Sequence, residues 1–241
     1  MTNLAGKTAI VTGATRGIGL AVARALLERE VRVVLCARNP VKVERTIASL
    51  RGNFGENVSG IGCDVSNPDS VKSLFDHLKR TYETLDILIN NAGVGLHRSI
   101  DEMTVEEWNA TLSTNLSGVF YCCHEAIPML KGKGGYIINI GSLAGKHASA
   151  GSAAYCASKF GLVGFTESLM QEVRYDHIRV SLIMPGSVNT SFGRGGGEDP
   201  SNTWKLVAED VAEVVVNALE MEPRALPSQI ELRPSEPKKK S

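Results

Sequence analysis

The chain has 241 residues, enough for one α/β domain with a sizeable apolar core. Its 26 basic and 26 acidic residues cancel, so no broad electrostatic field favours nucleic acid or an anionic membrane as a partner. The five cysteines form no Cys-x-x-Cys pair and the five histidines are scattered, which argues against a disulfide framework and a zinc site. The polar Gly6-Lys7 leaves no room for a signal peptide, and no apolar run approaches the roughly 20 residues that span a bilayer. We therefore expect a cytoplasmic protein with no metal, nucleic-acid or membrane partner.

Short β-branched runs alternate with longer amphipathic runs along the chain. Strands are expected at residues 8–11, 31–35, 57–63, 86–89, 136–140, 178–184 and 229–232. Helices are expected up to about residue 29, after residues 39–40, after residues 67–69, and over about 104–130, 151–175 and 208–221. This alternation predicts βαβ units. The expected fold class is α/β: a doubly wound, mostly parallel seven-stranded sheet of Rossmann type, with helices on both faces.

No internal repeat and no linker divides the sequence, so we expect residues 1–241 to form a single domain. Ligands of such sheets bind beyond the carboxyl ends of the strands, where the strand order reverses. The reactive residues are therefore expected just after the strands.

A Gly-rich turn, Thr12 to Gly19, follows the first expected strand. Glycines let the backbone turn sharply and approach a pyrophosphate, and the next helix points its N-terminal N–H groups at that anion. The spacing is Gly-x-x-x-Gly-x-Gly, which differs from the common dinucleotide fingerprint, and a tight structural connection is the alternative. Its position after the first strand favours cofactor binding. The candidate cofactor-binding residues here are Gly13, Thr15, Arg16, Gly17, Ile18 and Gly19.

Six further motifs follow in order. They are Asp64-Val65, Asn90-Asn91-Ala92-Gly93, Asn115, Ser142, Tyr155-Cys156-Ala157-Ser158-Lys159 and Pro185-Gly186. Together with the Gly-rich turn they resemble the short-chain dehydrogenase/reductase family, particularly its 3-oxoacyl-carrier-protein reductases, as far as about residue 190. The resemblance implies hydride exchange between a nicotinamide cofactor and a carbonyl or alcohol.

The end of the second strand indicates which cofactor is used. An acidic residue there would bind a ribose 2′-hydroxyl and repel a phosphate, but the sequence has Ala37 followed by Arg38. The Arg38 guanidinium suits a 2′-phosphate, and Arg16 resembles the second basic residue of NADP-preferring members. Each arginine alone is equally compatible with an exposed charge that has no partner. Together with the missing acid, they predict NADP(H).

Two motifs are expected at the adenosine end of the site. Asp64 and Val65 resemble the family's adenine contact, although Asp64 is equally compatible with a helix cap before Asn67. The small residues of Asn90 to Gly93 leave space for the adenosine ribose, and the asparagines can tie strand ends together. The candidates are Asn91, Ala92 and Gly93, whereas Asn90 fits a purely structural role.

The reactive groups are expected to be Ser142, Tyr155 and Lys159, with Asn115 completing the catalytic set. Tyr155 and Lys159 are one helical turn apart, so the Lys159 cation is expected to lower the Tyr155 pKa toward working pH. Ser142 can donate to the substrate oxygen as charge develops there. Resemblance to the family implies that Lys159 binds the nicotinamide ribose, and that Asn115 bends its helix and holds a water. Any one of these residues alone could be a cap, a packing residue or half of a surface pair.

Pro185 and Gly186 end the sixth strand, and the resemblance places Val188 and Thr190 beside the nicotinamide. Residues 191–203 are Gly-rich and are expected to form a flexible substrate loop, with ordinary disorder as the alternative. Residues 234–241, with three consecutive lysines, are expected to form a disordered tail. The segment before that tail lacks the family's usual glycine pattern.

The leading hypothesis is an NADP(H)-dependent oxidoreductase acting on a small carbonyl or alcohol, with Tyr155 as general acid and base. The alternatives are a reductase of 3-oxoacyl thioesters and an NADP(H)-binding regulatory protein without turnover. The helices near 104–130 and 151–175 resemble the family's dimer-forming helices, which predicts a homo-oligomer, either a dimer or a tetramer. The small residues of the second helix also fit tight packing within one subunit.

Overall fold

The computed structural model describes residues 2–192 and 199–237. The strands are β1 (Thr8–Thr12), β2 (Arg32–Ala37), β3 (Val58–Gly62), β4 (Ile87–Asn90), β5 (Gly135–Ile140), β6 (Ile178–Pro185) and β7 (Gln229–Leu232). The helices are α1 (Gly17–Leu27), α2 (Pro40–Phe54), α3 (Pro68–Tyr82), α4 (Val105–Leu112), α5 (Gly118–Leu130), α6 (Ala153–Val173) and α7 (Ala208–Glu220).

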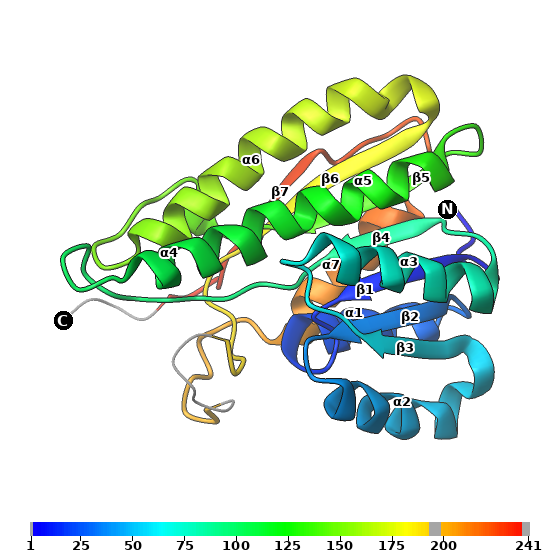
Figure 1. Cartoon of the computed structure of the whole chain (residues 1–241), viewed down its shortest axis with the longest axis horizontal. Helices are drawn as coiled ribbons and strands as arrows, with labels where there is room; N and C mark the ends of the chain where they lie inside the picture. The colour runs from blue at the N-terminus through cyan, green and yellow to red at the C-terminus, as the bar shows by residue number, and fades with distance from the viewer. Residues whose placement is uncertain (1, 193–198, 238–241) are drawn as a thin grey trace.

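Within the described residues the strands form one seven-stranded sheet in the order β3-β2-β1-β4-β5-β6-β7 (Figure 1). Every neighbouring pair is parallel, so the predicted α/β fold of Rossmann type is confirmed, with a sheet that is parallel throughout. The chain runs outward from β1 to β3 and then returns to place β4 on the other side of β1. This reversal opens a crevice at the carboxyl ends of β1 and β4.

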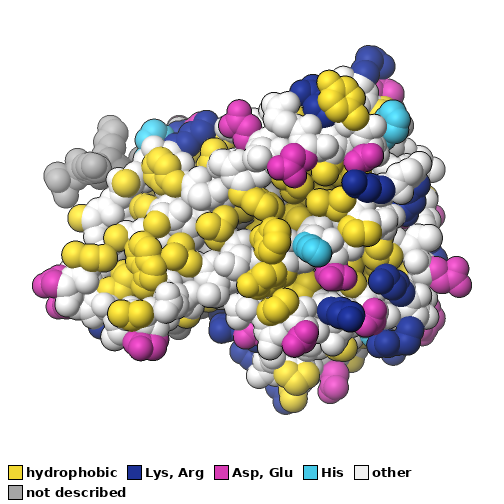
Figure 2. Space-filling model, turned by 45° about the horizontal axis from the view of Figure 1, so that its top comes forward, with side chains coloured by type: hydrophobic (Ala, Val, Ile, Leu, Met, Phe, Trp, Pro, Cys, Tyr) yellow, Lys and Arg dark blue, Asp and Glu magenta, His cyan; other side chains and the backbone are white. Residues whose placement is uncertain are grey.

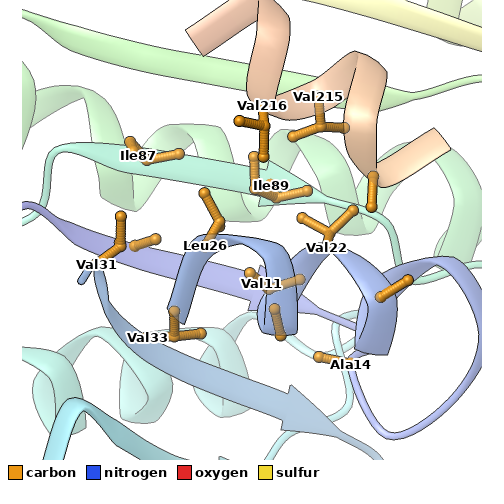
Figure 3. Packing of buried hydrophobic residues seen from close by; sticks show 14 of the residues in the cluster. Val11, Ala14, Val22, Leu26, Val31, Val33, Ile87, Ile89, Val215 and Val216 are labelled. Atoms are coloured by element: carbon orange, nitrogen blue, oxygen red, sulfur yellow. The ribbon is translucent and has the colours of Figure 1, made fainter. Parts of the chain in front are cut away.

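Two apolar clusters cover the two faces of the sheet. Ala9 and Val11 of β1 belong to one cluster and Ile10 to the other, as the two-residue period of a strand requires. Helices α1, α2 and α7 cover the first face, and α3, α5 and α6 cover the second. Figure 3 shows Val22 of α1 and Val216 of α7 packed above the strands of the first face.

Polar side chains begin several helices where the sequence predicts them. The Asn39 side chain accepts from the Lys42 N–H at the start of α2, and Asn67 accepts from two backbone N–H groups at the start of α3. Both are followed by proline, which has no N–H to lose in the first turn of a helix. Thr104 starts α4 with a capping box.

The long helix expected over residues 104–130 is interrupted. A π-helical turn, Ser113–Ser117, separates α4 from α5, and Asn115 lies at its centre. The predicted bend at Asn115 therefore takes the form of one widened turn.

Two predicted segments fall partly outside the described residues: 193–198 of the substrate loop and 238–241 of the tail. On the far side of the first gap, Asp199 exchanges two hydrogen bonds with Asn189, of 2.9 and 3.0 Å. That end of the loop is therefore fastened to the segment after β6.

Candidate active site

A cavity of about 420 Å³ lies at the carboxyl ends of the strands, within the range of small-molecule and cofactor sites. Most residues that the sequence proposes for the site line it. They are Gly13, Thr15, Arg16, Gly17, Ile18, Arg38, Val65, Asn91, Ala92, Gly93, Ser142, Tyr155, Lys159, Pro185, Gly186, Val188 and Thr190. Because these residues follow β1 to β6, the parallel sheet brings separate pieces of sequence to a single edge.

The Gly-rich turn is fixed against the end of β4. The Asn91 side chain donates to the carbonyl oxygens of Thr12 and Gly13 at 2.9 and 3.3 Å, and the backbone N–H groups of Asn91 and Ala92 donate to the Thr12 hydroxyl. The expected tie between strand ends is therefore confirmed for Asn91. Gly13 has a φ of +67°, and a Cβ there would lie 2.9 Å from the Ala92 Cα, so only glycine fits.

Helix α1 points its N-terminus at the cavity. Gly17 and Ile18 of its first turn line the cavity, and no side-chain hydrogen bond caps the helix at Arg16. Gly17 has a φ of +53°, and Thr190 packs across the turn, where a Gly17 Cβ would lie 3.4 Å from its side chain. The unpaired N–H groups of a helix N-terminus attract an anion.

Three proposed residues do not line the cavity. Gly19 packs on the turn, where a Cβ would lie 2.5 Å from the Gly13 carbonyl oxygen. Asp64 uses Oδ1 to accept from the Ser66 N–H and hydroxyl, at 3.0 and 2.7 Å. Asn67 caps α3, so the helix-cap interpretation of Asp64 is wrong. Asn115 is the third and is 1% exposed.

Asn115 joins the cavity wall to α6. Its side chain accepts from the Val94 N–H at 2.8 Å and donates to the Val94 carbonyl oxygen at 2.9 Å. It also donates to the Ser158 hydroxyl at 3.1 Å, directly beside Lys159 in the sequence. The amide therefore holds the Val94 segment against α6. Its predicted contact with a water stays a prediction.

Asn90 lies behind the site, buried, with its amide nitrogen donating to the Asn139 side chain at 2.9 Å. Asn139 in turn donates to the Thr166 hydroxyl at 2.9 Å. This chain of bonds links β4, β5 and α6, in agreement with the structural role expected for Asn90.

Lys159 is the buried cation of the site. Its side chain is 6% exposed, and Nζ donates to the Ile140 carbonyl oxygen at 2.9 Å. Burial lowers the Lys159 pKa to about 8, because removal from water disfavours the charged form. The Nζ lies 5.8 Å from the centre of the Tyr155 ring.

The Tyr155 pKa is raised above its ordinary value, so the expected lowering is wrong. Burial of the phenol is the largest cause, and a hydrogen bond with Ser142 opposes it in part. The Lys159 ammonium donates to the Ile140 carbonyl oxygen, and no lowering of the Tyr155 pKa comes from it. The phenol consequently keeps its proton at neutral pH and is suited to donate it.

The cofactor half of the cavity carries positive charge. Ala37 and Arg38 line it at the end of β2, where an acidic residue would exclude a phosphate. Arg16 lines it from the Gly-rich turn and donates to the Ser191 hydroxyl at 3.1 Å. Lys205 adds a third cation to the lining.

Several lining residues carry no sequence motif. They are Ala37, Cys63, Val94, His97, Thr114, Ile140, Gly141, Ser187, Ser191, Phe192 and Lys205. Phe192 places its ring 6.0 Å from that of Tyr155 and lies against Gly95, where a Cβ would meet its Cε1 at 2.6 Å. Two sequence features could have suggested residues of this lining. Phe192 is an isolated aromatic residue in a Gly-rich loop, and His97 is a histidine shortly after the Asn-Asn-Ala-Gly motif.

Two further searches of the described ranges gave negative results. Residues 2–192 and 199–237 contain no group of three His, Cys, Asp or Glu side chains that could hold a metal ion. None of the helices in those ranges has the length and apolar character needed to cross a membrane.

Comparison with known proteins finds dehydrogenases and reductases that are similar to this chain. A family model described as short chain dehydrogenase matches residues 7–200. The chain is 35% identical over 202 residues to a 3-oxoacyl-(acyl-carrier-protein) reductase, FabG, of Chlamydia trachomatis serovar D, covering 83% of this chain and 82% of the relative. It is 38% identical over 193 residues to carbonyl reductase family member 4 of Danio rerio, covering 80% of each.

Among solved structures, a metagenomic short-chain oxidoreductase in complex with NADP superimposes with a TM-score of 0.84. It is 35% identical, and the match covers 97% of this chain and 100% of that one.

Proposed function

The chain belongs to the short-chain dehydrogenase family of oxidoreductases, and on that premise we propose that it transfers a hydride between NADP(H) and a carbonyl or secondary alcohol. The observation that carries the proposal is the meeting of Ser142, Tyr155 and Lys159 in one cavity with the Gly-rich turn. The non-catalytic alternative predicts a damaged set of reactive groups, whereas this set is complete.

The residues of the cavity fit a dinucleotide. A side chain would clash with Ala92 at Gly13 and would be strained by the positive φ at Gly17, and the N-terminus of α1 provides N–H donors for a pyrophosphate. Arg38 would bind a 2′-phosphate at the end of β2, with Arg16 as a second cation. The metagenomic relative, which is 35% identical and was solved with NADP, supports NADP(H) as the cofactor of this chain.

We assign the proton chemistry to residues of α6 and β5. When bound, a reduced nicotinamide supplies the hydride to the carbonyl carbon. Tyr155, protonated because of its burial, gives its hydroxyl proton to the substrate oxygen, and Ser142 donates a hydrogen bond to the same oxygen. Lys159 would bind the nicotinamide ribose, and its positive charge would stabilise the phenolate that Tyr155 becomes. Asn115 keeps Val94 and α6 in place.

A 3-oxoacyl thioester is a second candidate substrate, favoured by the 35% identity to the FabG reductase of Chlamydia trachomatis. The similarity to a carbonyl reductase of Danio rerio supports a simpler ketone or aldehyde. Assaying all three classes by the loss of NADPH absorbance decides between them. Turnover of none would favour the regulatory alternative.

We also propose that the protein is cytoplasmic and forms a homo-oligomer. The five cysteines are unpaired thiols, as in a reducing compartment. Hydrophobic side chains gather on the face of α4, α5 and α6 (Figure 2), where the large side chains of Val105, Phe120 and Phe160 are exposed. Such a patch supports contact with a second copy of the chain.

Replacement of Arg38 tests the cofactor. In fluorescence titrations the wild type is expected to bind NADPH more tightly than NADH. Arg38→Asp should weaken NADPH binding at least about tenfold, since charge-assisted hydrogen bonds to the phosphate are lost and repulsion is added. NADH binding should stay within about twofold of wild type.

Arg45→Asp is the control, because Arg45 is an exposed arginine of α2 outside the cavity lining. It should leave both affinities unchanged. A wild type that prefers NADH, or an unchanged preference in Arg38→Asp, would contradict the assignment.

A further inference from the structure

His97 lies in the cavity wall beside the reactive groups. It follows β4 and lines the cavity, and its ring centre is 6.4 Å from that of Tyr155. Two contacts fasten this segment to the start of α6. The Arg98 N–H donates to the Gly151 carbonyl oxygen at 2.7 Å, and the His97 Nδ1 lies 2.8 Å from the Ser152 hydroxyl oxygen. Because Ser152 is three residues before Tyr155, both contacts fix His97 relative to the proton donor.

The hydrogen bonds around Ser152 orient the imidazole. Ser152 is 2% exposed, and its Oγ accepts from the Ser149 hydroxyl at 3.1 Å. We assign the proton of the Ser152 hydroxyl to the His97 Nδ1, which places the ring proton on Nε2. Within residues 2–192 and 199–237 no hydrogen bond uses that Nε2 atom. A donor is therefore available at the cavity wall.

Two rings lie close to Tyr155. The ring centres of His97 and Phe192 are 6.4 and 6.0 Å from that of Tyr155. A substrate whose carbonyl oxygen lies at the Tyr155 hydroxyl is therefore close to a hydrogen-bond donor and to an aromatic ring. His97 is exposed, so a hydrogen bond from it to a substrate competes with water and contributes as one ordinary hydrogen bond.

We infer that His97 is a specificity-determining residue that donates from Nε2 to a second oxygen of the substrate, close to the reacting carbonyl. Ser152 is a positioning residue that acts through His97. The favoured substrates are ketones that carry such an oxygen. This assignment rests on the proposed hydride transfer.

Two ketones of equal main-chain length test the inference: ethyl 3-oxobutanoate, which has a second carbonyl, and heptan-2-one, which does not. Wild type should reduce the oxoester with the higher kcat/KM. His97→Ala should raise the KM for the oxoester about three- to tenfold, the worth of one hydrogen bond, and leave kcat/KM for heptan-2-one within about twofold. Ser152→Ala should raise the same KM by less, with kcat unchanged.

His77→Ala is the matched control, because the His77 Nε2 also lies 2.8 Å from a serine hydroxyl, that of Ser59, but outside the cavity lining. This variant should leave kcat/KM for both ketones unchanged. If wild type and His97→Ala reduce the two ketones with the same ratio of kcat/KM values, the role of His97 is overturned. The hydride-transfer proposal is not affected by that result. Turnover of neither ketone by wild type would overturn the hydride-transfer proposal together with this inference.

Discussion

At the residue scale, Lys159 carries a positive charge that the fold buries away from water. Its pKa falls from 10.5 to about 8 on burial. Below pH 8 the folded chain holds a poorly hydrated ammonium, which costs about 3 kcal/mol of stability at 1.36 kcal/mol per pKa unit. Between pH 8 and 10.5 the unfolded chain binds the proton and the folded chain does not, so this contribution to stability increases with pH.

Lys159→Met should therefore stabilise the protein while removing activity. The gain of about 3 kcal/mol is reduced by about 1 to 2 kcal/mol because the Ile140 carbonyl oxygen loses its donor, which leaves about 1 to 2 kcal/mol at pH 7. Urea unfolding of wild type and variant at pH 7 measures the difference. The exposed Lys42 on α2 offers a control, Lys42→Met, with no expected change. A lower unfolding free energy for Lys159→Met would contradict the cost assigned to the buried charge.

At the element scale, the π-helical turn Ser113–Ser117 depends on contacts that are distant in sequence. Asn115 bonds to both backbone groups of Val94 and to the Ser158 hydroxyl. Asn115→Ala leaves these buried groups unpaired and should lower the free energy of unfolding by about 2 to 4 kcal/mol. It should also lower kcat, since Val94 lines the cavity.

Chemical unfolding monitored by circular dichroism measures the loss. Asn109→Ala is the control, because Asn109 is exposed on α4, just before the same turn. Equal stabilities of the two variants would show that the Asn115 side chain does not hold the turn.

Hydrophobic period and helix caps were sufficient to predict most elements. The Asn-Pro starts of α2 and α3 and the bounds of β7 were predicted, because caps and strand alternation are local properties. The interruption at Ser113–Ser117 was predicted only as a bend at Asn115. One extra residue in a turn hardly changes a helical period, and the partners at Val94 and Ser158 are set by the tertiary fold.

The residues of the candidate site were likewise predicted only in part. Residues at strand ends, such as Gly13 and Ser142, were predicted because a parallel sheet gathers strand ends at one edge, and Tyr155 on α6 was predicted from its motif. His97 and Phe192 were missed because loops have no period and their partners come from other segments. The predicted direction of the Tyr155 pKa shift was wrong because burial, which sequence spacing does not reveal, raises the pKa by more than the hydrogen bond with Ser142 lowers it.

At the scale of the whole molecule, the proposed contact between copies can be tested apart from catalysis. Phe120 is 49% exposed on the face of α4, α5 and α6. Phe120→Asp should reduce the molar mass in light scattering to that of one chain, since a charge would have to be buried in the interface. Tyr175→Asp, at an 86% exposed residue just after α6, should leave the mass unchanged. A monomeric wild type, or an unchanged mass for Phe120→Asp, would contradict the assignment.

The most direct test of the proposed reaction follows the hydride and the proton together. Wild type is incubated with NADPH carrying two deuterium atoms at the nicotinamide C4 and with a ketone that it reduces. The alcohol should contain one deuterium, on the former carbonyl carbon, by mass spectrometry and NMR. Tyr155→Phe should form this product at least about a hundredfold more slowly, with NADPH affinity within about twofold of wild type. An alcohol without deuterium, or a wild-type rate from Tyr155→Phe, would contradict hydride transfer with Tyr155 as proton donor.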